Sequence, residues 1–327
     1  MAIGKGSDFV IYDEEFNAGQ FELLRRNTDV FNAASQGALA LIRKDALGDY
    51  EKESFIQQLT GLITRRDLTS TAAAAPVKLE MDEFISVKLA RKILAEQTLD
   101  AWKKISKDER EMSFIIGEIV AKNKIADYLE AVITSAVTAI KVVTANVFDA
   151  SGQETPTLTA DHLANGMSRM GDQAGQIVAW VMHSKNYFNL VRQAISDKIF
   201  EEAGMVVYGS APGSLGKPVV VIDSPSLLDT MGSGVTQTYS VLGLVSGAAI
   251  AQESEPGTMI SELVTGGEQI TARIHGEHSF NVGVKGFKWD TSGGGANPTA
   301  ATLATGSNWD KVAADDKGTP GVLITVQ

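Results

Sequence analysis

Two histidines lie close enough in the sequence to suggest a metal site. His275 and His278 are separated by Gly276 and Glu277, and imidazole nitrogens are common ligands of zinc and other transition metals. The surrounding residues alternate in the manner of a β-strand, in which successive side chains point to opposite faces of the sheet. The two imidazoles then point apart and cannot share one metal ion. We interpret both as ordinary sheet or interface histidines.

A glycine-containing segment at 209–218 resembles two catalytic loops without matching either. A phosphate-binding loop needs a glycine where Ala211 stands and a hydroxyl residue where Pro218 follows Lys217. The serine of a nucleophile elbow would come one position later than Ser210. The sequence therefore predicts a turn that leads into a strand, with neither a nucleotide site nor a serine triad.

Carboxylates and tryptophans also fail to form a reactive group. Acidic residues stand side by side at 13–15, 201–202 and 315–316, but adjacent side chains diverge on a helix or strand and cannot act on one bond. The tryptophans are scattered without a basic surround, so we interpret them as core or interface anchors: Trp102, Trp180, Trp289 and Trp309. We expect no catalytic residue, no cofactor and no metal, and therefore no enzyme.

Composition places the chain among globular proteins of more than one lobe. It has 327 residues, 44% of them hydrophobic and 21% charged, which is ordinary for a folded protein of two or more lobes. It has no cysteine, which excludes disulfides and thiolate chemistry. The net charge of -11 disfavours a dedicated nucleic-acid binder but not a surface that encloses DNA. Without a signal peptide or an apolar run of roughly 20 residues, we expect the chain in the cytoplasm where it is made and not in a membrane.

The elements that would carry these residues change character along the chain. Residues 1–44 predict an arm with one helix, ending at the basic pair Arg43 and Lys44. Residues 45–92 predict a long two-stranded hairpin with a mobile tip of small residues. Apolar residues three or four apart over 111–144 predict a helix that is long for a globular protein.

Helices and strands alternate from residue 146 onward, which predicts mixed α and β structure around a buried sheet. Helices are predicted at 161–170, from Ser184 onward and at 298–305. Strands are predicted at 177–182, 205–208, 218–223, 239–245, 268–288 and 322–326.

Several of these segments resemble the Hong Kong 97-type capsid fold of tailed bacteriophages. Ile177–Ser184 looks like the family's apolar strand that ends in a polar turn and a helix, and Leu215–Val221 like its strand that opens with leucine, glycine, any residue, proline and valine. Tyr239–Gln252 is similar to the next strand pair, and Ile270–Phe287 to the long returning strand. The tail from Asn297 to Val326 looks more like short-tailed phages (podoviruses), including relatives of the Bordetella phage.

The resemblance implies an α+β fold in five parts. These are an N-terminal arm at 1–44, an extended hairpin loop at 45–92 and a peripheral domain with a spine helix at 93–145. An axial α/β domain at 146–265 follows. Residues 266–327 then form strands that belong again to the peripheral domain, followed by a C-terminal extension.

The resemblance also implies the function and the partners. The chain would be a major capsid protein that assembles with itself as pentamers and hexamers into an icosahedral head around double-stranded DNA, without sequence-specific binding. A portal, a separate scaffolding protein and a cement or decoration protein would be further partners, and assembly would occur in the cytoplasm of a bacterial host. Charged residues of the arm and hairpin would contact neighbouring subunits: Arg43, Lys44, Arg65, Arg66, Asp67 and Lys78.

Two other classes of function fit parts of the sequence. An encapsulin-like compartment has the same fold but encloses protein cargo, and the contents of the shell distinguish it from a phage head. A soluble α/β enzyme would need a convergent polar site, which the motifs above do not supply. A small species with turnover would identify it.

Overall fold

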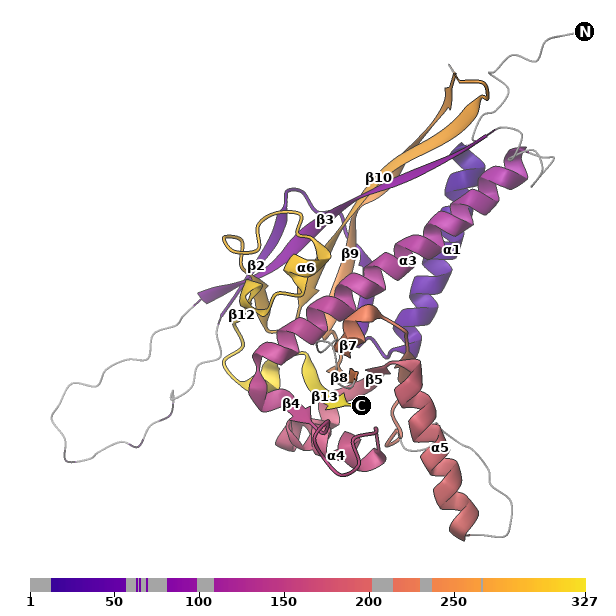
Figure 1. Ribbon diagram of the computed structural model, residues 1–327. Helices are drawn as coiled ribbons and strands as arrows, with labels where there is room; N and C mark the ends of the chain where they lie inside the picture. Colours follow the sequence, from indigo (N-terminus) through magenta and orange to yellow (C-terminus); the bar gives the residue numbers. More distant parts are fainter. Residues whose placement is uncertain are drawn as a thin grey trace, which may run out of the picture.

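The computed structural model describes residues 13–56, 63, 65, 69, 81–98, 109–201, 214–229, 237–265 and 267–327. Two sheets and one long helix, α3 (Glu109–Val142), organise them (Figure 1). Within the described residues, no helix is both long and apolar enough to cross a membrane.

Helix α3 is the spine of the molecule, as its apolar spacing predicts. Its 34 residues span roughly 50 Å at 1.5 Å per residue. Every residue from 131 to 140 is buried, because this half of the helix lies between other elements, whereas the first half has an exposed side. Helix α1 (Asp13–Ala34) packs along α3, which confirms the predicted helix of the arm.

A five-stranded sheet lies beside α3 and extends toward its N-terminal end (Figure 1). Its strands, in order across the sheet, are β1 (Leu39–Arg43), β9 (Ala249–Val264), β10 (Thr271–Val284), β3 (Met81–Thr98) and β2 (Tyr50–Ile56). Strands β2 and β3 pair antiparallel from Tyr50 opposite Val87 to Ile56 opposite Met81, which confirms the two strands of the predicted hairpin. The predicted tip at 69–76 lies outside the described residues except for Thr69.

A second, six-stranded sheet forms the other half. Its path is β4 (Val147–Asp149), β13 (Gly321–Val326), β8 (Thr238–Val245), β5 (Ile177–Met182) and β6 (Val219–Val221), and β7 (Leu228–Asp229) also pairs with β8. Strands β8, β5 and β13 are almost wholly buried, as expected for a sheet covered on both faces. Helices α4 (Ala160–Ser168) and α5 (Ser184–Glu201) belong to this half.

The sequence predictions for this half are largely confirmed. Strand β5 has the predicted bounds, α5 begins at Ser184, and β13 and the short helix α6 (Ala300–Leu303) lie where they were expected. The predicted strand at 268–288 is instead two strands, β10 and β11 (Phe287–Trp289), because a turn at Gly286 (φ +75°) separates them. The predicted strand at 205–208 lies outside the described residues.

The segment after β10 folds around two tryptophans. Trp289 of β11 and Trp309 of β12 (Trp309–Lys311) lie edge to face, with ring centroids 5.0 Å apart. The indole N–H of Trp289 donates to the carbonyl of Gly295, and that of Trp309 donates to Leu303, each at 3.0 Å. Both rings are almost fully buried. They are therefore core anchors, one of the two roles expected for the tryptophans from the sequence.

Candidate assembly surfaces

The arm is attached to the body through a strand as well as a helix. After α1, strand β1 pairs parallel with β9 from Leu39 opposite Ala249 to Arg43 opposite Glu253. The side-chain amide of Asn32 holds the turn between helix and strand, because it donates to the Leu41 carbonyl at 2.7 Å and accepts from the Leu41 amide at 2.9 Å. The arm is therefore part of the sheet and not a loose appendage over 13–43.

A buried ionic cluster lies where α3 crosses these strands. The ammonium of Lys124 is 3.6 Å from a Glu253 carboxylate oxygen, and the Tyr128 hydroxyl donates to the same oxygen at 3.3 Å. Arg43 approaches the other oxygen at 3.9 Å. The side chains of Lys124 and Glu253 are only 2% and 7% exposed, so helix, body strand and arm strand share one charge pair away from water.

Burial dominates the electrostatics of the cluster. It lowers the pKa of Lys124, although the Glu253 carboxylate acts in the opposite direction. Burial, aided by Glu253, raises the pKa of Tyr128 and keeps its phenol neutral. His278 of β10 lies beside Tyr128, with ring centroids 6.1 Å apart. Burial first, and then the charge of Lys124, lowers its pKa to about 4.

His278 should make the fold sensitive to acid. Its pKa is about 4 in the folded chain and about 6.5 when unfolded, so between these values the unfolded chain binds the extra proton. Stability is then complete above pH 6.5 and declines as the pH falls, by roughly 3 kcal/mol at pH 4. The groups that face the ring are Lys124 and Arg91, which oppose its protonation, and Asp127, which favours it.

Urea unfolding at pH 7 and pH 4.5 measures this effect. His278→Gln should reduce the loss of stability between the two values, because the substituted side chain does not titrate. His275→Gln is the matched control, since His275 is exposed on the opposite face of the same strand. An equal loss of stability in the His278 variant and the unsubstituted chain would contradict the assignment.

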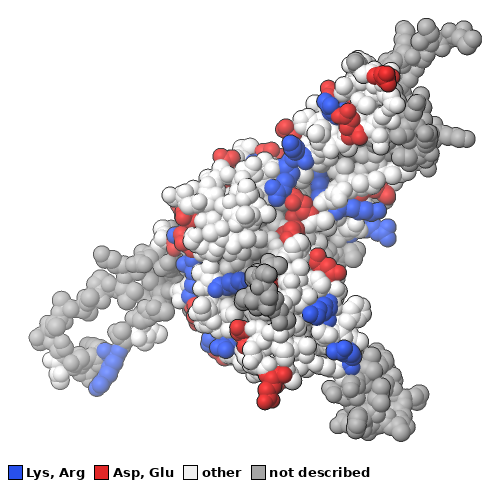
Figure 2. Space-filling view, in the orientation of Figure 1, with Lys and Arg blue, Asp and Glu red and all other residues white. Residues whose placement is uncertain are grey.

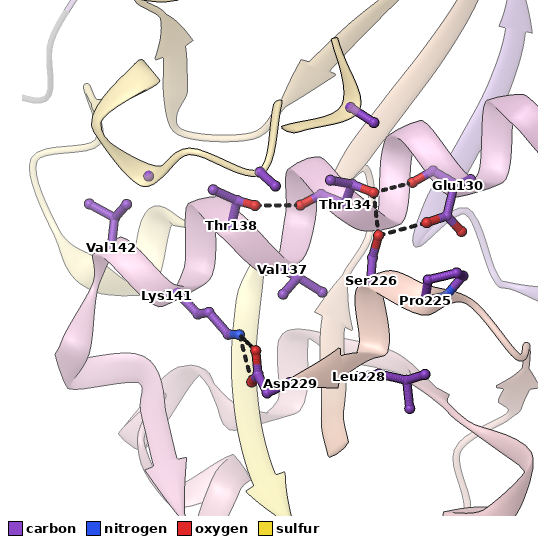
Figure 3. Close-up of a pocket in the computed structure, with 13 residues that line it drawn as sticks. Glu130, Thr134, Val137, Thr138, Lys141, Val142, Pro225, Ser226, Leu228 and Asp229 are labelled. Atoms are coloured by element: carbon purple, nitrogen blue, oxygen red, sulfur yellow. Dashed lines mark hydrogen bonds and ion pairs between the residues drawn. The ribbon is translucent and has the colours of Figure 1, made fainter. Parts of the chain in front are cut away.

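A cavity of about 690 Å³ lies between α3, the segment 225–229 and α6. Figure 3 shows how its polar side chains face one another. The Glu130 carboxylate accepts hydrogen bonds from Ser226 at 2.6 Å and from Ser224 at 2.5 Å. Lys141, almost three turns further along the helix, donates to both oxygens of Asp229 at 2.7 Å. These pairs fasten the segment leading into β7 to the spine.

This arrangement fits a structural joint better than a reactive centre. The carboxylate of Glu130 is engaged by two serine hydroxyls, and the ammonium of Lys141 by a carboxylate. The charged groups of this cavity are thus paired with groups of the same chain, which joins the segment 224–229 to the spine helix. Across the described part of the chain, no cluster of three or more His, Cys, Asp or Glu residues could hold a metal ion.

Large apolar side chains are exposed on both halves of the molecule. In the five-stranded sheet they are Ile42, Ile56, Met81, Leu94 and Ile260; in the six-stranded half they include Phe188, Leu215 and Val221. Figure 2 shows Lys and Arg interspersed with Asp and Glu on the visible face, without one continuous field of either sign. Apolar side chains that are scattered singly among mixed charges are common on protein surfaces and do not by themselves mark an interface.

The structure places three of the six predicted contact residues. Lys44 is hydrogen-bonded to Glu51 and Glu53 of β2 within the same chain, and the bond to Glu51 raises the pKa of Lys44. Arg43 belongs to the cluster with Glu253, and Arg65 is exposed. The other three, Arg66, Asp67 and Lys78, lie outside the described residues.

The sequence analysis did not identify the buried cluster. Lys124 and Tyr128 stand four residues apart on the predicted spine helix, which puts them on one face. A lysine on the side that carries Ala121 and Tyr128 could have suggested a buried partner. That Glu253 is this partner depends on how α3 packs against β9, which local patterns do not give.

Comparisons with known proteins agree with this architecture. A family model described as major capsid protein 13-like matches residues 8–323. No curated protein matches the sequence. The chain is similar in structure to the capsid of Helicobacter pylori bacteriophage KHP30, with a TM-score of 0.54, 10% identity, and coverage of 89% of this chain and 88% of that one.

Two further solved structures share the fold. Mycobacterium phage Bobi matches with a TM-score of 0.50 and 11% identity over 89% of each chain. The capsid of Ralstonia phage GP4 matches with a TM-score of 0.50 and 10% identity over 89% of this chain and 87% of that one. These likenesses support the Hong Kong 97-type fold expected from the sequence. Because the family model covers nearly the whole chain, the chain belongs to the major capsid protein 13-like family.

Proposed function

We propose that this capsid protein assembles as pentamers and hexamers into an icosahedral head that encloses double-stranded DNA. The observation that carries the proposal is the family match over 8–323, on a chain whose fold is similar to that of phage capsids. The role is structural, without catalysis.

The parts of the chain suggest how neighbouring copies would overlap. The arm, the extended loop, the peripheral domain with the spine helix and the axial domain are proposed with the bounds expected from the sequence. Strand β3 runs on to Thr98, and β9 lies in the same sheet as β1. The extended loop and the peripheral domain would therefore move as one body. The subunit contacts proposed for Arg43, Lys44, Arg65, Arg66, Asp67 and Lys78 belong to this scheme.

The resemblance to the capsid proteins of tailed phages implies further partners. A closed shell that is filled with DNA needs an entry vertex, which a portal would supply, and a separate scaffolding protein would set its size. A cement or decoration protein would bind the outer surface. We also propose assembly in the cytoplasm of a bacterial host and kinship with short-tailed phages such as the Bordetella phage. The net charge of -11 would weaken adhesion of packaged DNA to the shell.

Negative-stain electron microscopy of the expressed chain, with size-exclusion chromatography alongside, tests the proposal. The expected result is closed shells, or pentamers and hexamers on the way to them. Co-expression with neighbouring genes covers the case in which scaffolding is needed. A monomer or dimer that persists under all of these conditions would contradict a shell function. If shells do form, their DNA content distinguishes a phage head from a compartment that encloses protein cargo.

A further inference from the structure

Among the described residues, the edge of the long sheet formed by β3 is left open beyond β2. Strand β3 pairs with β10 along its whole length, but β2 covers its other side only from Met81 to Val87. Two contacts continue that side: the amide of Lys88 donates to the Asp49 carbonyl and the amide of Ala90 to Asn297, each at 2.9 Å. Beyond Ala90 the structure describes no strand beside this edge (Figure 1).

The open edge has a definite hydrogen-bonding pattern. Because the amides of Lys88 and Ala90 point outward, and N–H directions alternate along a strand, those of Lys92, Leu94 and Glu96 point outward too. Their carbonyl groups point the same way. An exposed edge of this kind is a template for another strand.

The side chains of the same three residues stand on the exposed face of the sheet. The strand register groups this face into three cross-strand rows: Lys92 and Glu277; Leu94, His275 and Ile260; Glu96, Arg273 and Glu262. The middle row is apolar apart from the imidazole, and Leu94 and Ile260 are 58% and 65% exposed. Charged rows flank it on both sides.

We propose that this edge pairs with the same edge of a second copy, antiparallel about a two-fold axis at Leu94. This inference rests on the proposed self-assembly and names one contact within it. In that register Leu94 lies opposite Leu94 of the second copy, and Lys92 lies opposite its Glu96, twice over by symmetry. All three residues carry outward N–H and C=O groups, so the backbones form hydrogen-bonded pairs without a shift.

The charge pattern favours this occupant and this register. Lys92 is exposed and forms no ion pair with any described residue, whereas Glu96 already shares Arg273 with Glu262. A second copy brings a cation to the acidic row and an acid to the unpaired lysine. It also joins the two apolar rows into one across both sheets, which covers Leu94. Opposite charges and apolar pairs in register are what stabilise neighbouring strands.

Engineered cysteines test the register directly, because the natural chain has none. In a hydrogen-bonded antiparallel pair the Cα atoms lie about 5.5 Å apart, within the range that a disulfide bridges. Leu94→Cys should therefore give covalent dimers when assembled particles are oxidised. Lys92→Cys alone should not, since the two copies of residue 92 would lie roughly 14 Å apart, but particles assembled from a mixture of Lys92→Cys and Glu96→Cys chains should.

Ile260→Cys is the matched control for exposure. It lies in the same row and is at least as exposed as Leu94, but on β9, two strands away from the β3 edge, so it should stay monomeric on a denaturing gel. Shells that form normally from Leu94→Cys chains without covalent dimers would overturn the pairing and leave the capsid function standing. Dimers through Lys92→Cys alone would overturn the register.

Charge exchange gives a second readout if the cysteine variant does not assemble. Lys92→Glu or Glu96→Lys alone places like charges opposite each other and should lower the yield of particles about tenfold. The double variant restores opposite charges in reversed order and should recover most of the yield. Glu262→Lys also removes a partner of Arg273 but lies away from the edge, so it controls for that loss. Unchanged yields in both single variants would refute the contact.

Discussion

Replacing Glu253 with alanine is expected to destabilise the subunit by about 3–5 kcal/mol, because it leaves the ammonium of Lys124 buried without a counter-ion. Lys124 is only 2% exposed, and burial already lowers its pKa. The variant also removes the acceptor of the Tyr128 hydroxyl. Urea unfolding followed by tryptophan fluorescence measures the change.

The neighbouring Glu255 supplies a control on the same strand. Its carboxylate pairs with Lys88 at 2.8 Å and is largely exposed, and the ammonium of Lys88 also donates to the Ala46 carbonyl. Glu255→Ala should therefore cost clearly less than Glu253→Ala, about 1 kcal/mol. The double variant Lys124→Met with Glu253→Leu should be more stable than Glu253→Ala, since no charge is left buried. A cost below about 1 kcal/mol for Glu253→Ala would mean that water reaches the cluster. The prediction would then be wrong.

Trp309→Ala is expected to destabilise the chain by about 3–5 kcal/mol. The ring is almost fully buried and lies edge to face with Trp289, so its removal leaves a large cavity beside a second unsupported ring. Thermal unfolding of the purified subunit measures the loss. The segment from β11 to α6 should become sensitive to proteolysis first, because the two indoles hold it together.

Trp309→Phe separates packing from hydrogen bonding at this site. Phenylalanine keeps an aromatic edge against Trp289 but loses the indole N–H that donates to Leu303. Its cost should lie well below that of alanine, at about 1–3 kcal/mol. If the two variants are equally destabilised, the ring contact contributes little and the hydrogen bond dominates.

Periodicity in the sequence was sufficient for elements whose burial follows a simple pattern. The spine helix carries apolar residues three or four apart, and α3 has nearly the predicted bounds. The continuous apolar run 177–182 became β5, buried within its sheet. In these cases the environment of the element is uniform along its length, so local pattern and tertiary structure agree.

Strand β9 shows why local patterns fail elsewhere. Its 16 residues include Pro256 and Gly257 among several polar residues, which argue against a strand. Strand β1 covers the outer side of β9 only as far as Glu253. The pairing with β10 passes from Glu255 opposite Ser279 to Thr258 opposite Glu277, so the proline lies in a bulge where no partner needs its missing N–H. The pairing of β9 with β10 also shifts register between Glu277 and Phe280. This irregularity accommodates Pro256 and Gly257 within the strand.

Some side-chain positions in the candidate site could be predicted from the sequence, and others could not. The strand alternation correctly put His275 and His278 on opposite faces, one exposed and one buried. The Glu130 and Glu253 contacts were not foreseen, because each joins elements that are far apart in the sequence. Whether Arg43, Lys44 and Arg65 contact neighbouring subunits stays a prediction.

The position of β13 also determines when the six-stranded sheet can be completed during synthesis of the chain. This strand lies between β4 and β8, yet it follows both in the sequence, by some 80 residues in the case of β8. A ribosome adds about 5–20 residues per second, so β8 has an unpaired edge for roughly 4 to 16 seconds after it is made. Until residue 326 emerges, β4 has no partner in the sheet. The six-stranded sheet can therefore be completed only after the last strand has left the ribosome.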